Sequence, residues 1–273
     1  MKYMFLLISF FVTFLKLSNA YALANCNIYN FDHVIKNDEN NTQITKIIDN
    51  KPLDKKHINN EVILCKGYNH VNTNKKIISL TFDDGPSKQY TEQILLLLRN
   101  NNIKSTFFFV GKNVKDYPEI VTMLYKNGHV IANHTHNHSR LSDLSEDEIK
   151  NQIVKCNLEI KKIIGVSPLL FRPPYGSCSI NSINVVRNLN LHTIMWSAMV
   201  DDYRIQGNSA EKIAHGILNL VKPGSIIGMH DGGGKRDNTV AALKIIIPTL
   251  KNQGYKFVTI PELLNISAYQ ISD

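Results

Sequence analysis

Cysteine is scarce in this sequence, and the few cysteines are not arranged to bind a metal. The four residues are Cys26, Cys65, Cys156 and Cys178, and their spacing lacks the close pairs that build structural zinc sites. Export of the chain would allow disulfides, but the four cysteines leave three pairings open. A Cys26–Cys65 bond would staple the N-terminal region, whereas Cys156 falls on the apolar face of a predicted helix and is expected to be buried.

Signatures of phosphate and nucleic-acid binding are also missing. No Gly-Lys-Ser/Thr follows Gly232-Gly233-Gly234, which argues against a phosphate-binding loop. The sequence has 31 basic and 23 acidic residues and a net charge of +8. Its lysines are nevertheless dispersed, in short clusters such as Lys55-Lys56, and no nucleic-acid motif accompanies them. We therefore expect solvated basic faces and no nucleic-acid partner.

Long apolar runs are absent after the N-terminus, where the sequence shows a targeting segment. Lys2, an apolar run and the small residues Ala22-Leu23-Ala24 identify residues 1–24 as a secretory signal peptide. Ser18-Asn19-Ala20 is a second candidate cleavage motif. We expect an exported protein that is secreted, periplasmic or associated with the cell envelope. It would be attached to a membrane only if the signal stays uncleaved or Cys26 is lipidated.

The rest of the chain divides by composition. Residues 25–74 are rich in Asn, Asp and Lys without periodicity, and predict a partly disordered N-terminal extension. Residues 75–265 alternate apolar strand-like runs with helical patterns, and 266–273 are expected to be a C-terminal tail. Strands are predicted at 77–82, 105–110, 129–133, 168–172, 192–197, 225–229 and 256–260, with a helix between each pair.

Helix 146–164 has the clearest signals, because a Ser145/Glu148 capping box precedes it and Gly165 follows it. The alternation of strands and helices predicts a parallel α/β domain, either a barrel or an open doubly wound sheet. In a barrel, the carboxyl ends of the strands would converge on one face.

Two acids and a histidine cluster follow predicted strands. Asp83 and Asp84 end the first strand, where one carboxylate could hold a metal and the other accept a proton. His134 and His138 follow the third strand, and on a helical turn their spacing would place both rings on one face. Imidazoles with one carboxylate suit zinc. Asp84, His134 and His138 are therefore the candidate metal ligands, and His136 is expected to face away.

Two further clusters follow later strands. Arg172-Pro173-Pro174-Tyr175-Gly176 predicts a stiff turn whose arginine could pair with a carboxylate of a neighbouring strand. His230 closes the strand at 225–229 and is a candidate general acid, because the reference pKa of histidine lies near neutrality. Asp201 and Asp202 follow the preceding strand, and one of them could hold the proton of His230.

The motifs T-F-D-D-G-P, H-T-x-x-H, R-P-P-Y-G and a strand ending in His-Asp occur in that order. Together they resemble the polysaccharide deacetylase family, the NodB-type carbohydrate esterases, over about residues 75–262. The resemblance implies a distorted (β/α) barrel of about seven strands. It also implies the following roles: Asp83 as general base, Arg172 orienting it, His230 as general acid, Asp202 as its partner, Tyr175 donating its backbone N–H to the oxyanion, and Pro173, Tyr175, Tyr203, Ile227 and Met229 contacting substrate.

One motif departs from the family pattern of an acid, two spacers and Asp-Trp. Met199 takes the first acidic place, and Asp202-Tyr203 replaces Asp-Trp. The resemblance thus implies a metal-dependent hydrolase, with zinc favoured, that releases acetate from N-acetylglucosamine-type glycans such as peptidoglycan, chitin oligomers or an exopolysaccharide. An O-acetyl esterase acting on xylan-like polymers and an inactive glycan-binding protein are the alternatives.

Overall fold

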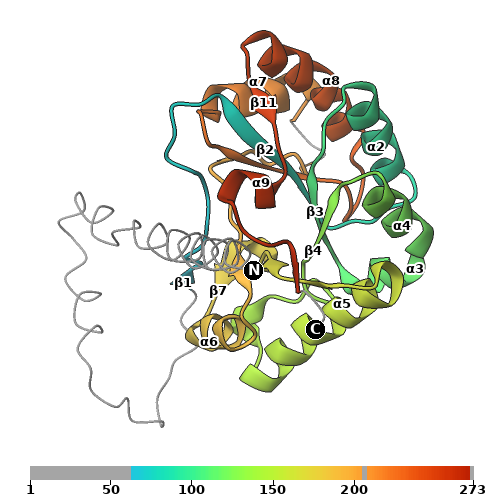
Figure 1. Ribbon diagram of the computed structural model, residues 1–273, viewed down its shortest axis with the longest axis vertical. Helices are drawn as coiled ribbons and strands as arrows, with labels where there is room; N and C mark the ends of the chain where they lie inside the picture. Colours follow the sequence, from blue (N-terminus) through green and yellow to red (C-terminus); the bar gives the residue numbers. More distant parts are fainter. Residues whose placement is uncertain (1–62, 205–207, 271–273) are drawn as a thin grey trace, which may run out of the picture. The chain divides into compact units, whose positions relative to one another are not determined.

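The computed structural model describes residues 63–204 and 208–270, and its centre is a curled parallel sheet (Figure 1). The strand order is β8-β6-β4-β3-β2-β10-β9, and β11 pairs with the beginning of β2. All these neighbours are parallel. The strands are β2 (Ile77–Asp83), β3 (Thr106–Phe109), β4 (Val130–Asn133), β6 (Leu170–Phe171), β8 (His192–Thr193), β9 (Ala198–Met199), β10 (Ile226–His230) and β11 (Lys256–Phe257).

The segment between β8 and β9 closes the sheet on itself. The Ile194 N–H donates to Phe171 O at 2.8 Å, on the β6 side. Three residues later, the Ser197 N–H donates to Ile226 O at 3.0 Å, on the β10 side. One short stretch of chain therefore joins the two edges of the sheet. This closure confirms the predicted distorted barrel and excludes the open sheet that periodicity alone allowed.

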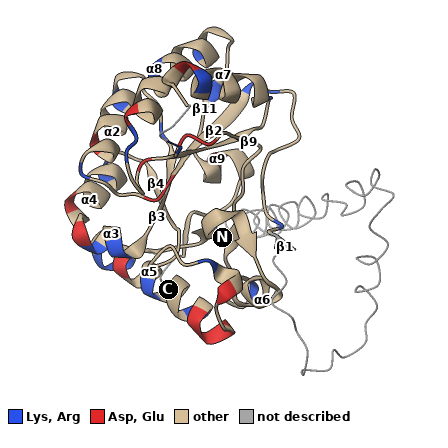
Figure 2. Ribbon diagram, turned by 180° about the vertical axis from the view of Figure 1, so that it is seen from behind, with Lys and Arg blue, Asp and Glu red and all other residues tan. Residues whose placement is uncertain are grey.

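Helices cover the outside of the barrel (Figure 1). They are α2 (Tyr90–Asn100), α3 (Gly111–Asp116), α4 (Pro118–Lys126), α5 (Glu146–Ile164), α6 (Ile180–Asn188), α7 (Ala210–Leu220), α8 (Asp237–Asn252) and α9 (Ile260–Leu264), with the 3-10 turns η3 (Leu141–Asp143) and η4 (Pro174–Gly176). Charged residues are spread over several of these helices (Figure 2), as the dispersed lysines of the sequence predicted. No helix in the described part of the chain is both long and apolar enough to cross a membrane.

Helix α5 begins and ends where the sequence predicts. The Glu148 N–H donates to Ser145 Oγ at 3.4 Å, and the Ser145 N–H donates to Glu148 Oε2 at 2.8 Å, which completes the capping box. Gly165 ends the helix with a left-handed φ of 82°. Boundaries set by such local signals can be read from sequence.

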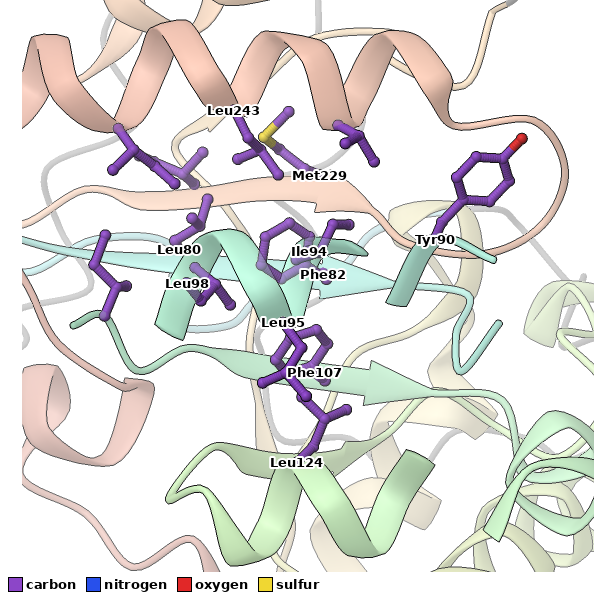
Figure 3. Packing of buried hydrophobic residues seen from close by; sticks show 14 of the residues in the cluster. Leu80, Phe82, Tyr90, Ile94, Leu95, Leu98, Phe107, Leu124, Met229 and Leu243 are labelled. Atoms are coloured by element: carbon purple, nitrogen blue, oxygen red, sulfur yellow. The ribbon is translucent and has the colours of Figure 1, made fainter. Parts of the chain in front are cut away.

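Alternate residues of the central strands pack on opposite sides of the barrel wall. Leu80, Phe82, Phe107 and Met229 face the outer helices and are fully buried there (Figure 3). A second cluster fills the inside, and its members include Phe108, Ala132, Leu170 and Ile226, with Ile260 and Leu263 of α9 packed against them. Because side chains alternate along a strand, Thr81 and Asp83 point to this inner side.

Some predicted boundaries are wrong. The predicted helix at 117–126 is preceded by the separate helix α3, and Pro118 begins α4 after a break at Tyr117. The predicted strand 256–260 ends at Phe257, because Thr259 forms a capping box with Glu262 and starts α9. Residues of the expected tail form β12 (Tyr269–Gln270), which pairs with β5 (Ser167–Pro168).

The last part of the predicted extension belongs to the folded domain. β1 (Ile63–Leu64) pairs antiparallel with β7 (Ser177–Cys178), and Cys65 forms a disulfide with Cys178. This settles the open pairing for two cysteines, and Cys156 is free and buried. Cys26, the signal and residues 25–62 of the extension lie outside the described residues. The disulfide ties the chain before the barrel to the segment that directly follows η4.

Helix α2 offers a test of the packing. Leu98 is fully buried between α2 and the sheet, whereas Leu96 on the same helix is 57% exposed. Leu98→Ala should lower the free energy of unfolding by about 2–5 kcal/mol, since it removes buried methyl groups and leaves a cavity. Leu96→Ala is the matched control and should change it by less than about 0.5 kcal/mol. Denaturant titration of both variants measures the difference, and equal losses would contradict this packing.

Candidate active site

The carboxyl ends of β2, β4, β6 and β10 bring the candidate residues to one end of the barrel. Asp83 and His230 are partners in the parallel register of β2 and β10. His134 follows β4, and Arg172 follows β6, whose register joins Asn133 to Phe171. In a parallel barrel this is the face where loops can carry chemistry without disturbing the wall.

Asp84, His134 and His138 form a group that fits a divalent metal. Their ligand atoms all lie within 4.8 Å of one another. Asp84 Oδ1 lies 3.4 Å from His134 Nε2 and 3.1 Å from His138 Nε2, and this buried oxygen accepts no hydrogen bond. A carboxylate oxygen and two imidazole nitrogens turned toward the same point are a usual donor set for Zn²⁺ and similar ions.

Neighbouring groups prepare these side chains for a cation. His134 Nδ1 lies 2.7 Å from Arg172 O, so the Nδ1–H donates to that carbonyl and Nε2 keeps its lone pair. Burial alone would raise the pKa of Asp84. The close contacts of Asp84 with His134 and His138 outweigh burial and hold the pKa of Asp84 well below its usual range. The carboxylate is therefore ionised.

The backbone around the candidate ligands is strained. Asp84, Thr135 and His138 have φ values of 74°, 65° and 57°, a left-handed conformation that costs about 1–3 kcal/mol at a residue other than glycine. Asn113 Nδ2 donates to Asp84 O at 2.8 Å, and the Thr135 N–H donates to Asn133 Oδ1 at 2.8 Å. Such strain is common at functional sites, where the surroundings enforce it.

The histidine pair converges for a different reason from the expected one. Residues 134–138 form a loop and no helical turn, so the left-handed residues bring the two rings together. His136 is buried against α3 and α5: a Cβ added to Gly111 would lie 2.6 Å from His136 Nδ1 and 2.9 Å from Cys156 Cα. His136 is thus away from the other two histidines, where the sequence placed it.

Asp83 forms a buried ion pair with Arg172. Arg172 Nη1 donates to Asp83 Oδ1 at 2.6 Å and to Thr81 Oγ1 at 2.8 Å. Burial lowers the pKa of Arg172, and the charge of Asp83 opposes that shift. Asp83 is 3% exposed. The guanidinium therefore fixes the carboxylate in place and provides the positive charge that compensates it.

A second ion pair holds His230. His230 Nδ1 lies 2.6 Å from Asp202 Oδ1, and the His230 backbone N–H donates to Asp202 Oδ2 at 3.0 Å. Burial lowers the pKa of His230, but the charge of Asp202 and its hydrogen bond outweigh burial and raise the pKa to about 9. The imidazole is therefore protonated at neutral pH. Asp201, the other candidate partner, instead contacts Tyr203 and Arg204.

Residues 70–194 match the family model described as polysaccharide deacetylase. The peptidoglycan-N-acetylglucosamine deacetylase of Bacillus cereus is 40% identical over 195 residues, which are 71% of this chain and 70% of that protein. The chain belongs to the polysaccharide deacetylase family.

Solved structures of other family members are similar to this polysaccharide deacetylase. One is a peptidoglycan N-acetylglucosamine deacetylase in complex with 4-naphthalen-1-yl-N-oxidanyl-benzamide. It is 37% identical, with a TM-score of 0.71, over 75% of this chain and 94% of that chain. Another is an acetyl xylan esterase from Clostridium thermocellum in complex with a cobalt ion. It is 37% identical, with a TM-score of 0.65, over 70% of this chain and 91% of that chain.

Two tyrosines stand at the rim of the deacetylase site. Tyr175 is 57% exposed, and its ring lies 4.7 Å from the His138 ring and 4.3 Å from the Arg140 guanidinium. Tyr203 is 43% exposed and meets the His230 ring edge-on at 5.4 Å. Both rings can face a sugar, whereas Pro173 is buried.

The structure places two expected substrate contacts elsewhere. Ile227 and Met229 are essentially unexposed and pack in the outer core, and Figure 3 shows Met229 beneath the helix that carries Leu243. His230 points to the opposite side of β10, because successive side chains alternate. This alternation can be read from the sequence, and it predicts that Ile227 and Met229 face away from His230.

Sequence reasoning missed several residues that support the site of this deacetylase. Thr239 Oγ1 donates to Asp202 Oδ2 at 2.9 Å and so helps to hold the partner of His230. Asp231 is fully buried, accepts from Thr91 Oγ1 at 2.5 Å, and has its pKa raised to about 7 by burial. The two contacts join residues 37 and 140 positions apart in the sequence, and no local pattern predicts them.

The pair of Asp202 and His230 makes a prediction about pKa. Asp202→Asn removes the charge that raises the pKa of His230 and leaves the burial that lowers it, so the imidazole should titrate well below pH 9. Asp201→Asn is the matched control and should leave that pKa unchanged, because Asp201 contacts Tyr203. NMR titration of His230 in chelator-treated protein measures both. A shift in the Asp201 variant alone would reverse the assignment.

Proposed function

We propose that this polysaccharide deacetylase is an exported, metal-dependent hydrolase that removes N-acetyl groups from N-acetylglucosamine-type glycans. One arrangement carries the proposal. Two ion pairs, Arg172–Asp83 and Asp202–His230, hold a carboxylate and a protonated imidazole at the ends of adjacent strands, beside Asp84 and its two histidines. The names of the relatives support the substrate class, and the signal predicted at residues 1–24 supports export.

The chain supplies a base and an acid for amide hydrolysis. Asp83, held in place by Arg172, accepts a proton from the attacking water. The Tyr175 backbone N–H donates to the developing oxyanion. His230 then donates its proton to the glucosamine nitrogen as the C–N bond breaks, and Asp202 stabilises the imidazolium until that moment. The products are acetate and a free amine on the sugar.

The candidate ligands fit one divalent cation. Asp84, His134 and His138 would hold it, and when bound it supplies a Lewis acid that polarises the acetyl carbonyl and makes water more acidic. Two imidazoles and one carboxylate favour zinc among the common ions. The ionised state of Asp84 and the donor contact between His134 and Arg172 O both serve this binding.

Two alternatives differ from this proposal in the bond that they cleave. An O-acetyl esterase would use the same residues on an acetylated xylan, and the similar acetyl xylan esterase favours that possibility. An inactive glycan-binding protein would release nothing. The base, the acid and the three candidate ligands are all present, which argues for an active enzyme.

Variants of the acid pair separate metal binding from proton transfer. Asp84→Asn should weaken zinc binding by at least tenfold, because it replaces a charged ligand with a neutral one. Asp83→Asn is its neighbour and control, and should keep the metal while lowering kcat by at least a hundredfold. Metal content after dialysis and the rate of acetate release are measured on the same samples. A metal-free Asp83→Asn beside a loaded Asp84→Asn would exchange the two roles.

Acetate release from a panel of glycans tests the function itself. Chitooligosaccharides and peptidoglycan fragments should release acetate, a chelator should stop the release, and added Zn²⁺ should restore it. Acetylated xylan should react more slowly. Faster release from xylan would establish the esterase alternative, and no release from any glycan with the metal supplied would establish the inactive one.

A further inference from the structure

Met199 occupies the place where the family pattern has an acid, and the structure shows what lies against it. Met199 in β9 and Gly228 in β10 are partners in the parallel register. Gly228 stands two residues before His230 on the same strand, and therefore on the same side of the barrel wall. Met199 therefore lies beside β10 at a position two residues before His230, the candidate acid.

The absence of a side chain at Gly228 makes this contact close. A Cβ added to Gly228 would lie 2.6 Å from Met199 Cε and 3.4 Å from Trp196 Cβ. The thioether methyl of Met199 therefore covers the backbone of β10 just below His230. Gly228 is buried, whereas Met199 and Trp196 each keep part of their surface exposed. We call the side chains of Met199 and Trp196 the acyl wall.

Trp196 extends the acyl wall toward the other catalytic groups. A Cβ added to Gly176, the residue after Tyr175, would lie 2.8 Å from Trp196 Cη2. The Arg172 guanidinium lies 5.6 Å from the Trp196 ring. The wall therefore runs between the Tyr175 turn, the arginine behind Asp83, and the strand that ends in His230.

In the proposed reaction, the acyl group of the substrate lies between Asp83 and His230. Its carbonyl carbon has to reach the water that Asp83 activates, and its nitrogen has to reach His230. The methyl of the acetyl group then requires an apolar neighbour close to both. Ile227 and Met229 cannot provide one, because they pack on the opposite side of β10 in the outer core.

We propose that Met199 and Trp196 contact the acyl group of the substrate, and that Met199 restricts the enzyme to acetyl. This inference rests on the proposed N-deacetylase function and specifies how that site recognises its substrate. Methionine suits the role, because its unbranched side chain fills the irregular space that Gly228 leaves. The volume that the Met199 side chain occupies then limits the length of the acyl group that fits the site.

The test is the ratio of kcat/KM for two acyl groups on the same sugar chain. Chitotetraose carrying N-propionyl groups is compared with chitotetraose carrying N-acetyl groups, with zinc supplied to both. Met199→Ala should raise the propionyl-to-acetyl ratio at least tenfold, within the roughly 10–200-fold effect of one methylene in an apolar pocket. Met199→Val, which keeps part of the apolar surface, should give an intermediate ratio.

Met229→Ala is the matched control, since it shortens a methionine on the other side of the neighbouring strand. It should leave the ratio within twofold of the wild type. Both substrates are measured on one preparation, so partial loss of folded enzyme cancels. An unchanged ratio in Met199→Ala would overturn the proposal, and so would an equal change in Met229→Ala. If the wild type releases neither acetate nor propionate, the proposed function fails instead.

Discussion

The buried guanidinium of Arg172 is the constraint on which the rest of the site depends. Taking an arginine out of water is costly, and the cost is offset only when its donors and its charge are matched. Here the guanidinium donates to Asp83, to Thr81 and to the carbonyls of Ile194 and Met195. The two carbonyls belong to the segment that closes the barrel. The same side chain therefore aims a carboxylate and fixes the closure of the sheet.

Much of the site was predictable because its parts are short motifs at strand ends. Asp83 and Asp84, the His134–His138 pair and His230 each follow an apolar run, and parallel strands place such ends together. The resemblance supplied what periodicity could not, namely the choice of a barrel. Helix α5 was predicted to the residue, since its capping box and its terminal glycine act within a few positions.

The remainder depended on contacts that no local pattern contains. His134 and His138 converge through left-handed residues in a loop, and the sequence suggested a helical turn. The Cys65–Cys178 bond joins residues 113 positions apart, and its β1–β7 partners are too short to register as strands. Ile227 and Met229 were assigned to the substrate by analogy, against the alternation of side chains that separates them from His230. Where analogy and strand geometry disagreed, geometry decided.

Trp196 gives the protein a built-in optical reporter. It is the only tryptophan of the chain, and it touches the turn after Tyr175, the arginine behind Asp83 and the strand of His230. Fluorescence excited at wavelengths that tyrosine does not absorb therefore comes only from Trp196 in the acyl wall. Arrival of a sugar, exchange of the cation and opening of the barrel seam would each alter the colour or intensity of one fluorophore, without any label.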